Sequence, residues 1–431
     1  MPNPGDRVKV STLKSTEEGI LMPSYDEKAV LIKLDNGYNI GFKKEEIKKI
    51  TVIKKASKTV KKSQKLTPNK SLPNIALLHT GGTIASKVDY RTGGVVASFK
   101  PEDLLEMFPE LFSIANIQSE LIAQMWSDDL RFAHFSLIAK KIKSTVEKGV
   151  KGIIIGMGTD NLSVAAAALS FIVEETPIPI ILVGSQRSSD RGSSDAAMNL
   201  VCAAEFIKQT DFTGVAICMH EYSSDKSCLI LPAAKTYKLH SSRRDAFQAV
   251  NDMPIAKVDY AARNVNYIKK NYPNNGRKLI LKSAMEEKVG LLKIHINMFP
   301  EQFEFFKGYK GLIIEGTGLG HTPGQVPNPE ANIHKRIYPA IKSLVDSGCT
   351  VVMTTQCLFG TVNMNVYDKG RDLLNLGVIS GKDMLANTAL VKLSWLIAND
   401  PKQAKELMGK NLRGEINERL QYEDKYLKVK E

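Results

Sequence analysis

The segment IALLHTGGTIAS (residues 75–86) joins four consecutive apolar residues to a histidine, two glycines and two threonines. Four apolar residues in a row are typical of a strand that is buried on both faces of a parallel sheet. Gly81 and Gly82 allow the chain to turn sharply and leave backbone N–H groups free to meet an anion. The segment therefore predicts a buried strand that ends in a tight turn, with the hydroxyls of Thr80 and Thr83 beside it.

Apolar runs alternate with helical stretches after residue 74. Strands are expected at residues 75–79, 152–156, 178–184 and 214–218, and helices at 129–147, 162–175 and 195–208. A second series has strands at 289–296, 311–315 and 350–354 and helices at 300–307, 330–346 and 388–399. Asn274-Asn275-Gly276 between the two series indicates a hairpin or a crossover. The pattern predicts two α/β lobes with parallel sheets, whose ligands bind beyond the carboxyl ends of the strands.

The N-terminal region has a different pattern. Residues 5–53 alternate apolar and polar positions, and Asp35-Asn36-Gly37 favours a type I′ hairpin, which predicts a small all-β barrel of five strands. Residues 43–70 then hold 11 lysines against two glutamates, in a chain of formal net charge +13. No aromatic residue lies among the lysines after residue 50, so we interpret this stretch as a solvated linker rather than an RNA-binding arm.

These patterns divide the 431 residues into several units. We expect a β-barrel at 1–53, a lysine-rich linker at 54–72, an N-terminal lobe at 73–270, an inter-lobe connection at 271–287 and a C-terminal lobe at 288–431. The last unit is expected to close with a charged amphipathic helix that carries Leu407, Met408, Ile416 and Leu420.

Several classes of protein are excluded by composition and spacing. The sequence lacks an apolar run of membrane-spanning length and a signal-peptide pattern, so we expect a cytoplasmic protein. Its five cysteines form no CxxC pair and its seven histidines are scattered, so neither a disulfide framework nor a metal site is expected. A dinucleotide fingerprint is excluded because no third glycine follows Gly158 at the required spacing.

Four segments rich in small polar residues each end a strand or begin a helix: residues 80–83, 156–161, 184–195 and 238–245. Taken singly, each has a simpler interpretation. Asp160 or Asn161 would cap a helix, Asp195 would cap the next one after a loose polar loop, and the last segment would be a charged surface turn.

Together, these segments offer the parts for acyl transfer. A threonine hydroxyl is a poor nucleophile unless a base or a proton path lies beside it. A lysine can act in this way if its neighbours lower its pKa or relay its proton, and a carboxylate can hold it in place. Thr83, Thr159, Asp160 and Lys238 could supply this set.

The motifs TGGTI (80–84), GTD (158–160), VGSQRSSD (183–190) and the Lys238 segment, in this order, resemble the bacterial-type L-asparaginase family over residues 74–400. The resemblance implies a two-lobed asparaginase-like fold. It also implies that Thr83 is the nucleophile and that Thr159, Asp160 and Lys238 form a second catalytic group. By the same resemblance, Tyr90 closes the site, and Ser127 and Asp128 bind the α-carboxylate and α-amino groups of the substrate.

A narrower resemblance rests on the N-terminal barrel with LDNGYNIG (34–41), on KLHSSRRDAF (238–247) and on QCLFGTVNMNVY (356–367). Together they are similar to the D-subunit family of archaeal glutamyl-tRNA(Gln) amidotransferases, carbon–nitrogen ligases of protein biosynthesis. This implies a glutaminase that releases ammonia for a GatE-type partner, in a heterodimer that pairs again through D–D contacts. The glutaminase chain would need no cofactor, whereas the partner would use ATP and Mg²⁺ and bind most of the tRNA.

Two positions depart from the asparaginase pattern. Family members usually read HGTDT where this chain has Met157 and Asn161 around GTD, which would change the polarity behind the site. The acidic residue that a neighbouring subunit supplies in free asparaginases has no clear counterpart, and residues 363–365 are where we look for it. Whether glutamine or asparagine is preferred stays open, because the two differ by one methylene.

Two other functions remain compatible with the sequence. One is a stand-alone L-asparaginase with an appended barrel, which would share every catalytic residue. The other is a non-catalytic RNA-binding scaffold, in which the barrel and the lysines do the work. The combination of Thr83, Thr159, Asp160 and Lys238 argues against a scaffold.

Overall fold

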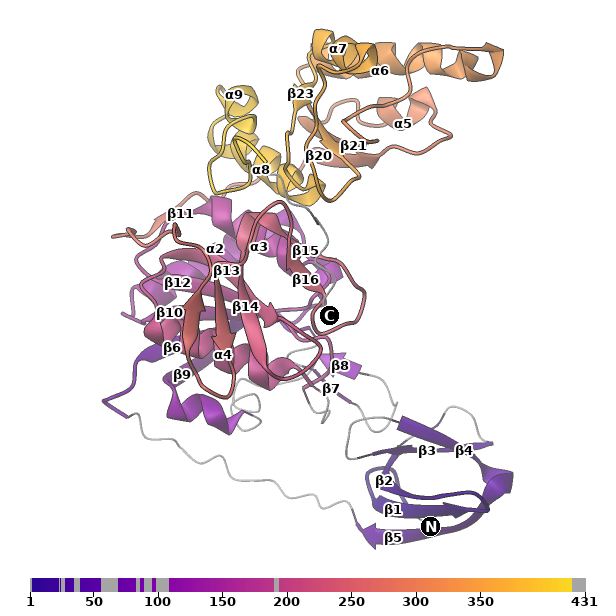
Figure 1. The fold of residues 1–431 in the computed structure, drawn as a ribbon, viewed down its shortest axis with the longest axis vertical. Coiled ribbons are helices and arrows are strands. Elements are labelled where there is room, and N and C mark those ends of the chain that lie inside the picture. Colours follow the sequence, from indigo (N-terminus) through magenta and orange to yellow (C-terminus); the bar gives the residue numbers. More distant parts are fainter. Residues whose placement is uncertain are drawn as a thin grey trace.

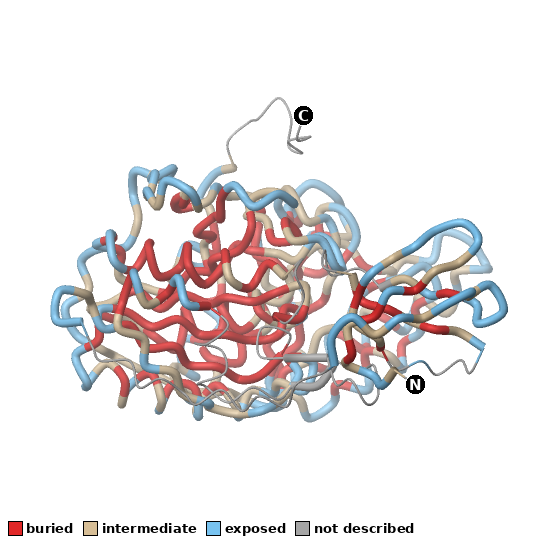
Figure 2. The backbone as a smooth tube through the Cα atoms, turned by 90° about the horizontal axis from the view of Figure 1, so that it is seen from below, coloured by how far each residue is buried: buried red, intermediate tan, exposed pale blue. Residues whose placement is uncertain are grey.

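The computed structural model describes residues 2–22, 24, 28–34, 39–55, 69–82, 86–88, 95–97, 108–189 and 194–420. Figure 1 shows a small all-β unit at the N-terminus, followed by a large α/β lobe and a smaller one. This confirms the predicted fold class. In Figure 2 the buried residues gather inside the lobes, and the exposed ones line the loops around them.

The N-terminal unit is a five-stranded antiparallel sheet. Its strands are β1 (Arg7–Thr12), β2 (Thr16–Met22), β3 (Ala29–Lys33), β4 (Asn39–Lys43) and β5 (Ile47–Lys54), in the order β4-β3-β2-β1-β5. Alternate residues of β1, β3 and β4 form its small core: Val8, Val10, Val30, Ile32 and Phe42. β3 and β4 pair as the hairpin signal predicts, although Asp35-Asn36-Gly37 itself lies outside the described residues. No ladder joins β4 to β5 in the part of this unit that the structure describes.

The N-terminal lobe is built on an eight-stranded sheet of order β18-β17-β14-β13-β12-β10-β6-β9. Five neighbouring strands are parallel: β6 (Asn74–His79), β9 (Asn116–Leu121), β10 (Gly152–Gly156), β12 (Pro179–Val183) and β13 (Gly214–His220). Three antiparallel strands extend one edge: β14 (Ser227–Pro232), β17 (Ala256–Asp259) and β18 (Val265–Tyr267). The sequence indicated neither β14 nor β17, and among the parallel strands it did not indicate β9.

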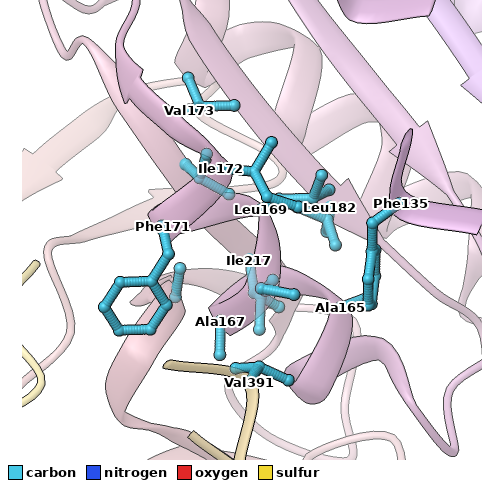
Figure 3. Close-up of a cluster of buried hydrophobic side chains, with 14 of the residues drawn as sticks. Phe135, Ala165, Ala167, Leu169, Phe171, Ile172, Val173, Leu182, Ile217 and Val391 are labelled. Atoms are coloured by element: carbon cyan, nitrogen blue, oxygen red, sulfur yellow. The ribbon is translucent and has the colours of Figure 1, made fainter. Parts of the chain in front are cut away.

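Helices cover both faces of this sheet. Successive strand residues point to opposite faces, and the residues on both faces are apolar, so each face needs a cover. Ala76 and Leu78 of β6 face the core beneath α2 (Phe132–Val146) and α3 (Leu162–Ile172). Ile75 and Leu77 face the core beneath α4 (Ala196–Gln209). Figure 3 shows the first of these cores, in which Leu169 and Phe171 of α3 lie among side chains of the sheet and of the second lobe.

The C-terminal lobe has a four-stranded parallel sheet of β20 (Val289–Lys293), β21 (Gly311–Gly316), β22 (Thr350–Thr355) and β23 (Ile379–Ser380). One face carries α5 (Pro300–Glu304), α6 (Ile337–Asp346) and α7 (Asp368–Asn375), of which α7 was not predicted. The other face carries α8 (Ala386–Asn399), which also packs on α3, with the rings of Trp395 and Phe171 5.9 Å apart. One continuous core therefore joins the two lobes.

The connection between the lobes is a crossover rather than a hairpin. Strand β18 pairs with β17, whereas β19 (Ile280–Leu281) pairs with β11 (Val173–Glu175), so the segments on either side of Asn274-Asn275-Gly276 do not pair with each other. The predicted helix 162–175 accordingly ends at Ile172, where β11 begins.

The predicted terminal helix is wrong. A short helix, α9 (Ala404–Met408), is followed by irregular backbone to residue 420, and residues 421–431 lie outside the described part. Gly414 has a φ of 83°, and the buried Glu415 carboxylate accepts hydrogen bonds from the backbone of Leu412 and Arg413. Glu415 also pairs with the buried Lys392 at 2.6 Å, so burial of this ion pair overrides the helical pattern.

Across the described residues, no helix combines the length and the apolar character needed to cross a membrane.

Candidate active site

The turn after β6 lies at the carboxyl edge of the sheet, as the opening segment predicts. The Thr80 N–H donates to the carbonyl of Gly156 at the end of β10, at 3.0 Å. Gly81 and Gly82 have φ values of 91° and 76°, which side chains strongly disfavour. A Cβ on Gly82 would overlap the backbone of Gly158, so the turn packs directly on the GTD segment.

Replacing Gly82 by alanine should lower both stability and activity. The added Cβ would occupy a left-handed conformation, which costs about 1–2 kcal/mol, and would also push Gly158 away from the turn. We expect a lower midpoint of urea unfolding and a marked loss of amide hydrolysis. Gly149→Ala is the matched control, because Gly149 has a φ of 73° but open space around its Cα, so only the backbone cost remains. If the two substitutions had equal effects, the close packing of Gly82 on Gly158 would not be the cause of the losses.

Lys238, Thr159 and Asp160 meet at this edge from segments that are far apart in sequence. Lys238 ends β15 (Thr236–Lys238), which pairs with β16 (Phe247–Ala249). Its Nζ donates to Thr159 Oγ1 at 2.9 Å and to Asp160 Oδ1 at 2.8 Å. The Thr159 residue is buried and the Lys238 side chain is 12% exposed, whereas the Asp160 side chain is 72% exposed. The ammonium is thus positioned by a carboxylate and contacts a hydroxyl through which it can exchange a proton.

The helix-cap interpretation of this segment is wrong. Helix α3 begins after Asn161, whose side chain makes no cap hydrogen bond. Instead, Asn161 Nδ2 donates to the Ser127 carbonyl at 2.7 Å, and the Asn161 N–H donates to Ser127 Oγ at 3.3 Å. Asn161, one of the two departures from the family motif, therefore holds Ser127 against the GTD segment, and Met157, the other, is buried in the apolar core.

Of the other four site residues that the sequence predicts, the structure describes Ser127 and Asp128. Ser127 is buried, and a Cβ on Gly158 would lie 2.8 Å from its hydroxyl. Asp128 is exposed beside it, with no hydrogen bond to Thr159, Asp160 or Lys238 in the described structure. Thr83 and Tyr90 lie outside the described residues. Thr83 directly follows Gly82 in the chain.

The loop between β12 and α4 is held firmly where the structure describes it, rather than being a loose polar loop. The buried Asp195 carboxylate accepts the N–H groups of Gln186, at 3.0 Å, and Arg187, at 3.1 Å. Thr159 Oγ1 donates to Gln186 Oε1 at 3.4 Å. The sequence alone indicated no role for the Gln186 side chain, although Gln186 stands in the VGSQRSSD motif and among hydroxyl residues.

His79 directly precedes the turn at residues 80–82, whereas the candidate residues 363–365 belong to the C-terminal lobe. His79 at the end of β6 is buried, and neither ring nitrogen bonds to a residue that the structure describes. Burial lowers its pKa to about 4, so its ring is neutral at pH 7. Asn363 and Asn365 are exposed on the C-terminal lobe, where the Asn363 N–H donates to the Leu319 carbonyl at 3.0 Å. Among the residues described, no cluster of side chains has the composition of a metal site.

Sequence models of three families match the chain. Residues 74–272 match "Asparaginase, N-terminal", residues 288–408 match "Glutaminase/Asparaginase C-terminal domain" and residues 2–53 match "GatD N-terminal domain". The thermostable L-asparaginase from Thermococcus kodakarensis has a similar structure, with a TM-score of 0.70 and 27% identity, covering 80% of this chain and 100% of that one. The L-asparaginase I from Vibrio cholerae superposes with a TM-score of 0.68 at 25% identity, covering 80% of this chain and 99% of that one. The fold and the site thus define an asparaginase-like amidohydrolase.

The full-length relatives narrow this class. The glutamyl-tRNA(Gln) amidotransferase D subunit of Pyrococcus furiosus is 44% identical, over 96% of this chain and 94% of that protein. The corresponding D subunit of Methanococcus maripaludis strain C6 is 42% identical, over 97% of this chain and 99% of that protein. The chain belongs to the family of glutamyl-tRNA(Gln) amidotransferase D subunits.

Proposed function

We propose that this chain is the glutaminase subunit that supplies ammonia for converting Glu-tRNA(Gln) to Gln-tRNA(Gln). The observation that carries the proposal is the contact of Lys238 with Thr159 and Asp160, at the sheet edge where the TGG turn packs on Gly158. The matches of the N-terminal sheet and of the whole chain to amidotransferase D subunits support the link to tRNA.

The residues suggest a reaction in two halves. The Thr83 hydroxyl attacks the side-chain amide carbon of glutamine, its proton passes to the departing nitrogen, and ammonia leaves from the acyl-enzyme. Water then attacks the ester, which releases glutamate and restores the Thr83 hydroxyl. Thr159 and Lys238 carry the protons, and Asp160 holds Lys238 and faces the α-ammonium of the substrate.

The ammonia is consumed by a partner subunit of the E type. That partner binds the tRNA and uses ATP and Mg²⁺ to activate the glutamyl group, while this chain itself needs no cofactor. D–D contacts would pair two such heterodimers, and residues 363–365 are candidates for completing the site of a second copy. A basic segment such as residues 43–70 would favour a polyanionic partner nearby.

Purification with a candidate E subunit tests this function. We expect the two chains to copurify, and we expect glutamine hydrolysis, measured as ammonia release, to rise when Glu-tRNA(Gln) is added. If this chain alone hydrolysed asparagine rapidly, and neither tRNA nor partner changed the rate, it would be a stand-alone asparaginase.

The scaffold alternative is distinguished by a different result. Tight tRNA binding by this chain alone in a gel shift at several salt concentrations, with no amide hydrolysis under any condition, would favour the scaffold. The geometry of the Lys238 site supports an enzyme instead, because a scaffold has no need for a lysine positioned on a buried threonine hydroxyl.

A further inference from the structure

Buried hydrogen bonds continue from the site into the lobe through helix α4. Asn199, one turn after Asp195, donates its Nδ2 to the Gly184 carbonyl at 3.0 Å and to Asp195 Oδ2 at 3.3 Å. Both residues are fully buried. Together, Asp195 and Asn199 fix the backbone at Gly184 and Gln186, and the Gln186 side chain accepts the hydroxyl of Thr159.

The orientation of the Asn199 amide determines which ring nitrogen of His220 must carry the proton. Asn199 Nδ2 also lies 3.6 Å from Met219 Sδ, and all three of its partners can only accept. The other amide atom, Oδ1, therefore faces His220 Nδ1, at 2.6 Å. An amide oxygen only accepts, so His220 must carry its proton on Nδ1 to hold Asn199. The Cys228 thiol also donates to this oxygen, at 3.2 Å.

A second acceptor competes for the same proton. His220 Nε2 lies 3.2 Å from Asp225 Oδ1 in the loop between β13 and β14. Arg244 Nη1 donates to that same Asp225 oxygen at 2.9 Å. Burial lowers the pKa of His220, and the nearby carboxylates of Asp225 and Asp195 oppose this. A neutral ring has one N–H and cannot serve Asn199 and Asp225 at once.

We propose that His220 is a positioning residue for the glutaminase site, and that pairing of the exposed Asp225 carboxylate with Arg244 keeps the imidazole proton on Nδ1. This inference rests on the proposed function. By pairing with Asp225, Arg244 weakens the pull of that carboxylate on the imidazole proton. The proton then serves Asn199, which holds Gln186 against Thr159. When Arg244 is absent or makes another contact, the imidazole proton moves to Nε2, which donates it to Asp225. His220 then no longer donates to Asn199, and Gln186 is held less firmly.

Two single substitutions and their combination test this proposal in the complex with the partner subunit. Arg244→Gln should lower kcat for glutamine hydrolysis about tenfold with KM nearly unchanged, because a small misplacement behind a catalytic group costs rate more than binding. Asp225→Asn should retain the wild-type kcat, since its amide can donate to Nε2 and leave the proton on Nδ1. The double substitution should restore the rate that Arg244→Gln loses. A double variant as slow as Arg244→Gln would overturn the proposal.

The tautomer can also be measured without any activity. Nitrogen NMR of the full chain with ¹⁵N-labelled histidine should show the His220 proton on Nδ1 in the wild type and in Asp225→Asn, and on Nε2 in Arg244→Gln. An unchanged tautomer in Arg244→Gln would refute the positioning role whatever the rates are. If the wild-type complex failed to hydrolyse glutamine while the tautomer moved as expected, the proposed function would fail and the hydrogen-bond relay would stand.

A buried control separates positioning from general damage to the core. Cys218 lies on β13 two residues before His220, is fully buried and donates its thiol hydrogen to the backbone carbonyl of Asn199, at 3.5 Å, rather than to the Asn199 side chain. Cys218→Ala should lower the unfolding midpoint but leave kcat and the His220 tautomer unchanged. A loss of kcat equal to that of Arg244→Gln would show that any disturbance of this core slows the enzyme, and would count against the relay.

Discussion

Replacing Lys238 by methionine should abolish glutamine-dependent amidation of Glu-tRNA(Gln), while amidation from free ammonia continues at an unchanged rate. Lys238 is the cation that contacts both Thr159 and Asp160, so its loss removes the proton path, and we expect glutaminase kcat to fall by about 10²–10⁴-fold. The two rates are measured in one purified complex, with glutamine or an ammonium salt as the nitrogen source.

The substitution is chosen so that the fold survives it. Methionine has nearly the length of lysine and suits a side chain that is only 12% exposed. Asp160, at 72% exposed, remains hydrated after losing its partner, so no unpaired charge is buried. Lys148→Met, at an exposed lysine after α2, is the control and should change neither rate. Glutamine-dependent amidation at the wild-type rate in Lys238→Met would show that Lys238 is not part of the machinery.

Thr83 provides the companion test of the nucleophile. Thr83→Ala should give the same separation between the two nitrogen sources, whereas Thr83→Ser should keep part of the glutaminase rate because it keeps a hydroxyl. Loss of ammonia-dependent amidation in Thr83→Ala would instead indicate damage to the complex.

Most of the parallel strands could be predicted because each is a run of mainly apolar residues in its sheet. Strand β9 was missed because most of its residues are polar and none is fully buried, and β23 was missed because it has only two residues. The strands at 75–79 and 152–156 have nearly the predicted limits. Strands β17 and β18 are short and partly exposed, so their pattern is weak. Strand β14 is a mostly buried run of six residues that the same apolar pattern could have identified. Helix α7 was missed because only one face of it is buried, where Gly370 and Leu373 lie.

Within the site, sequence motifs identified the groups that would do chemistry, but not those that hold them. Thr159, Asp160 and Lys238 stand in recognisable motifs, and the structure brings them together. Asn199 and His220 stand in a helix and a strand that look like ordinary core elements. Their proposed role depends on side-chain hydrogen bonds between different helices, strands and loops, and a local sequence pattern does not predict such bonds. The terminal helix failed for a similar reason, since the Lys392–Glu415 pair forms only in the folded lobe.

Replacing Asp383 by alanine should produce the largest loss of stability, about 3–5 kcal/mol in the free energy of unfolding. Asp383 of the C-terminal lobe pairs with Lys235, and both side chains are almost completely buried. Burial lowers the pKa of Lys235, and the Asp383 carboxylate opposes that shift. Without the carboxylate, the ammonium would keep its hydrogen bond to the backbone carbonyl of residue 383, at 3.2 Å, but would lose the negative charge that it contacts. Asn417 would lose two hydrogen bonds to the same carboxylate, from its N–H at 3.0 Å and its Nδ2 at 2.9 Å, and would keep the bond from Nδ2 to the Asn251 carbonyl.

The pair also bears on activity, because Lys235 directly precedes the strand that carries Lys238. We expect Asp383→Ala to lower the glutaminase rate, and urea unfolding followed by tryptophan fluorescence to give the stability. The double substitution Lys235→Met with Asp383→Leu should recover much of the lost stability, since it leaves no unpaired charge in the core. Lys342→Met breaks the exposed pair with Asp346 and should change little, because such pairs are screened by solvent. If Asp383→Ala were no more destabilising than Lys342→Met, the buried Lys235–Asp383 pair would not stabilise the contact between the two lobes.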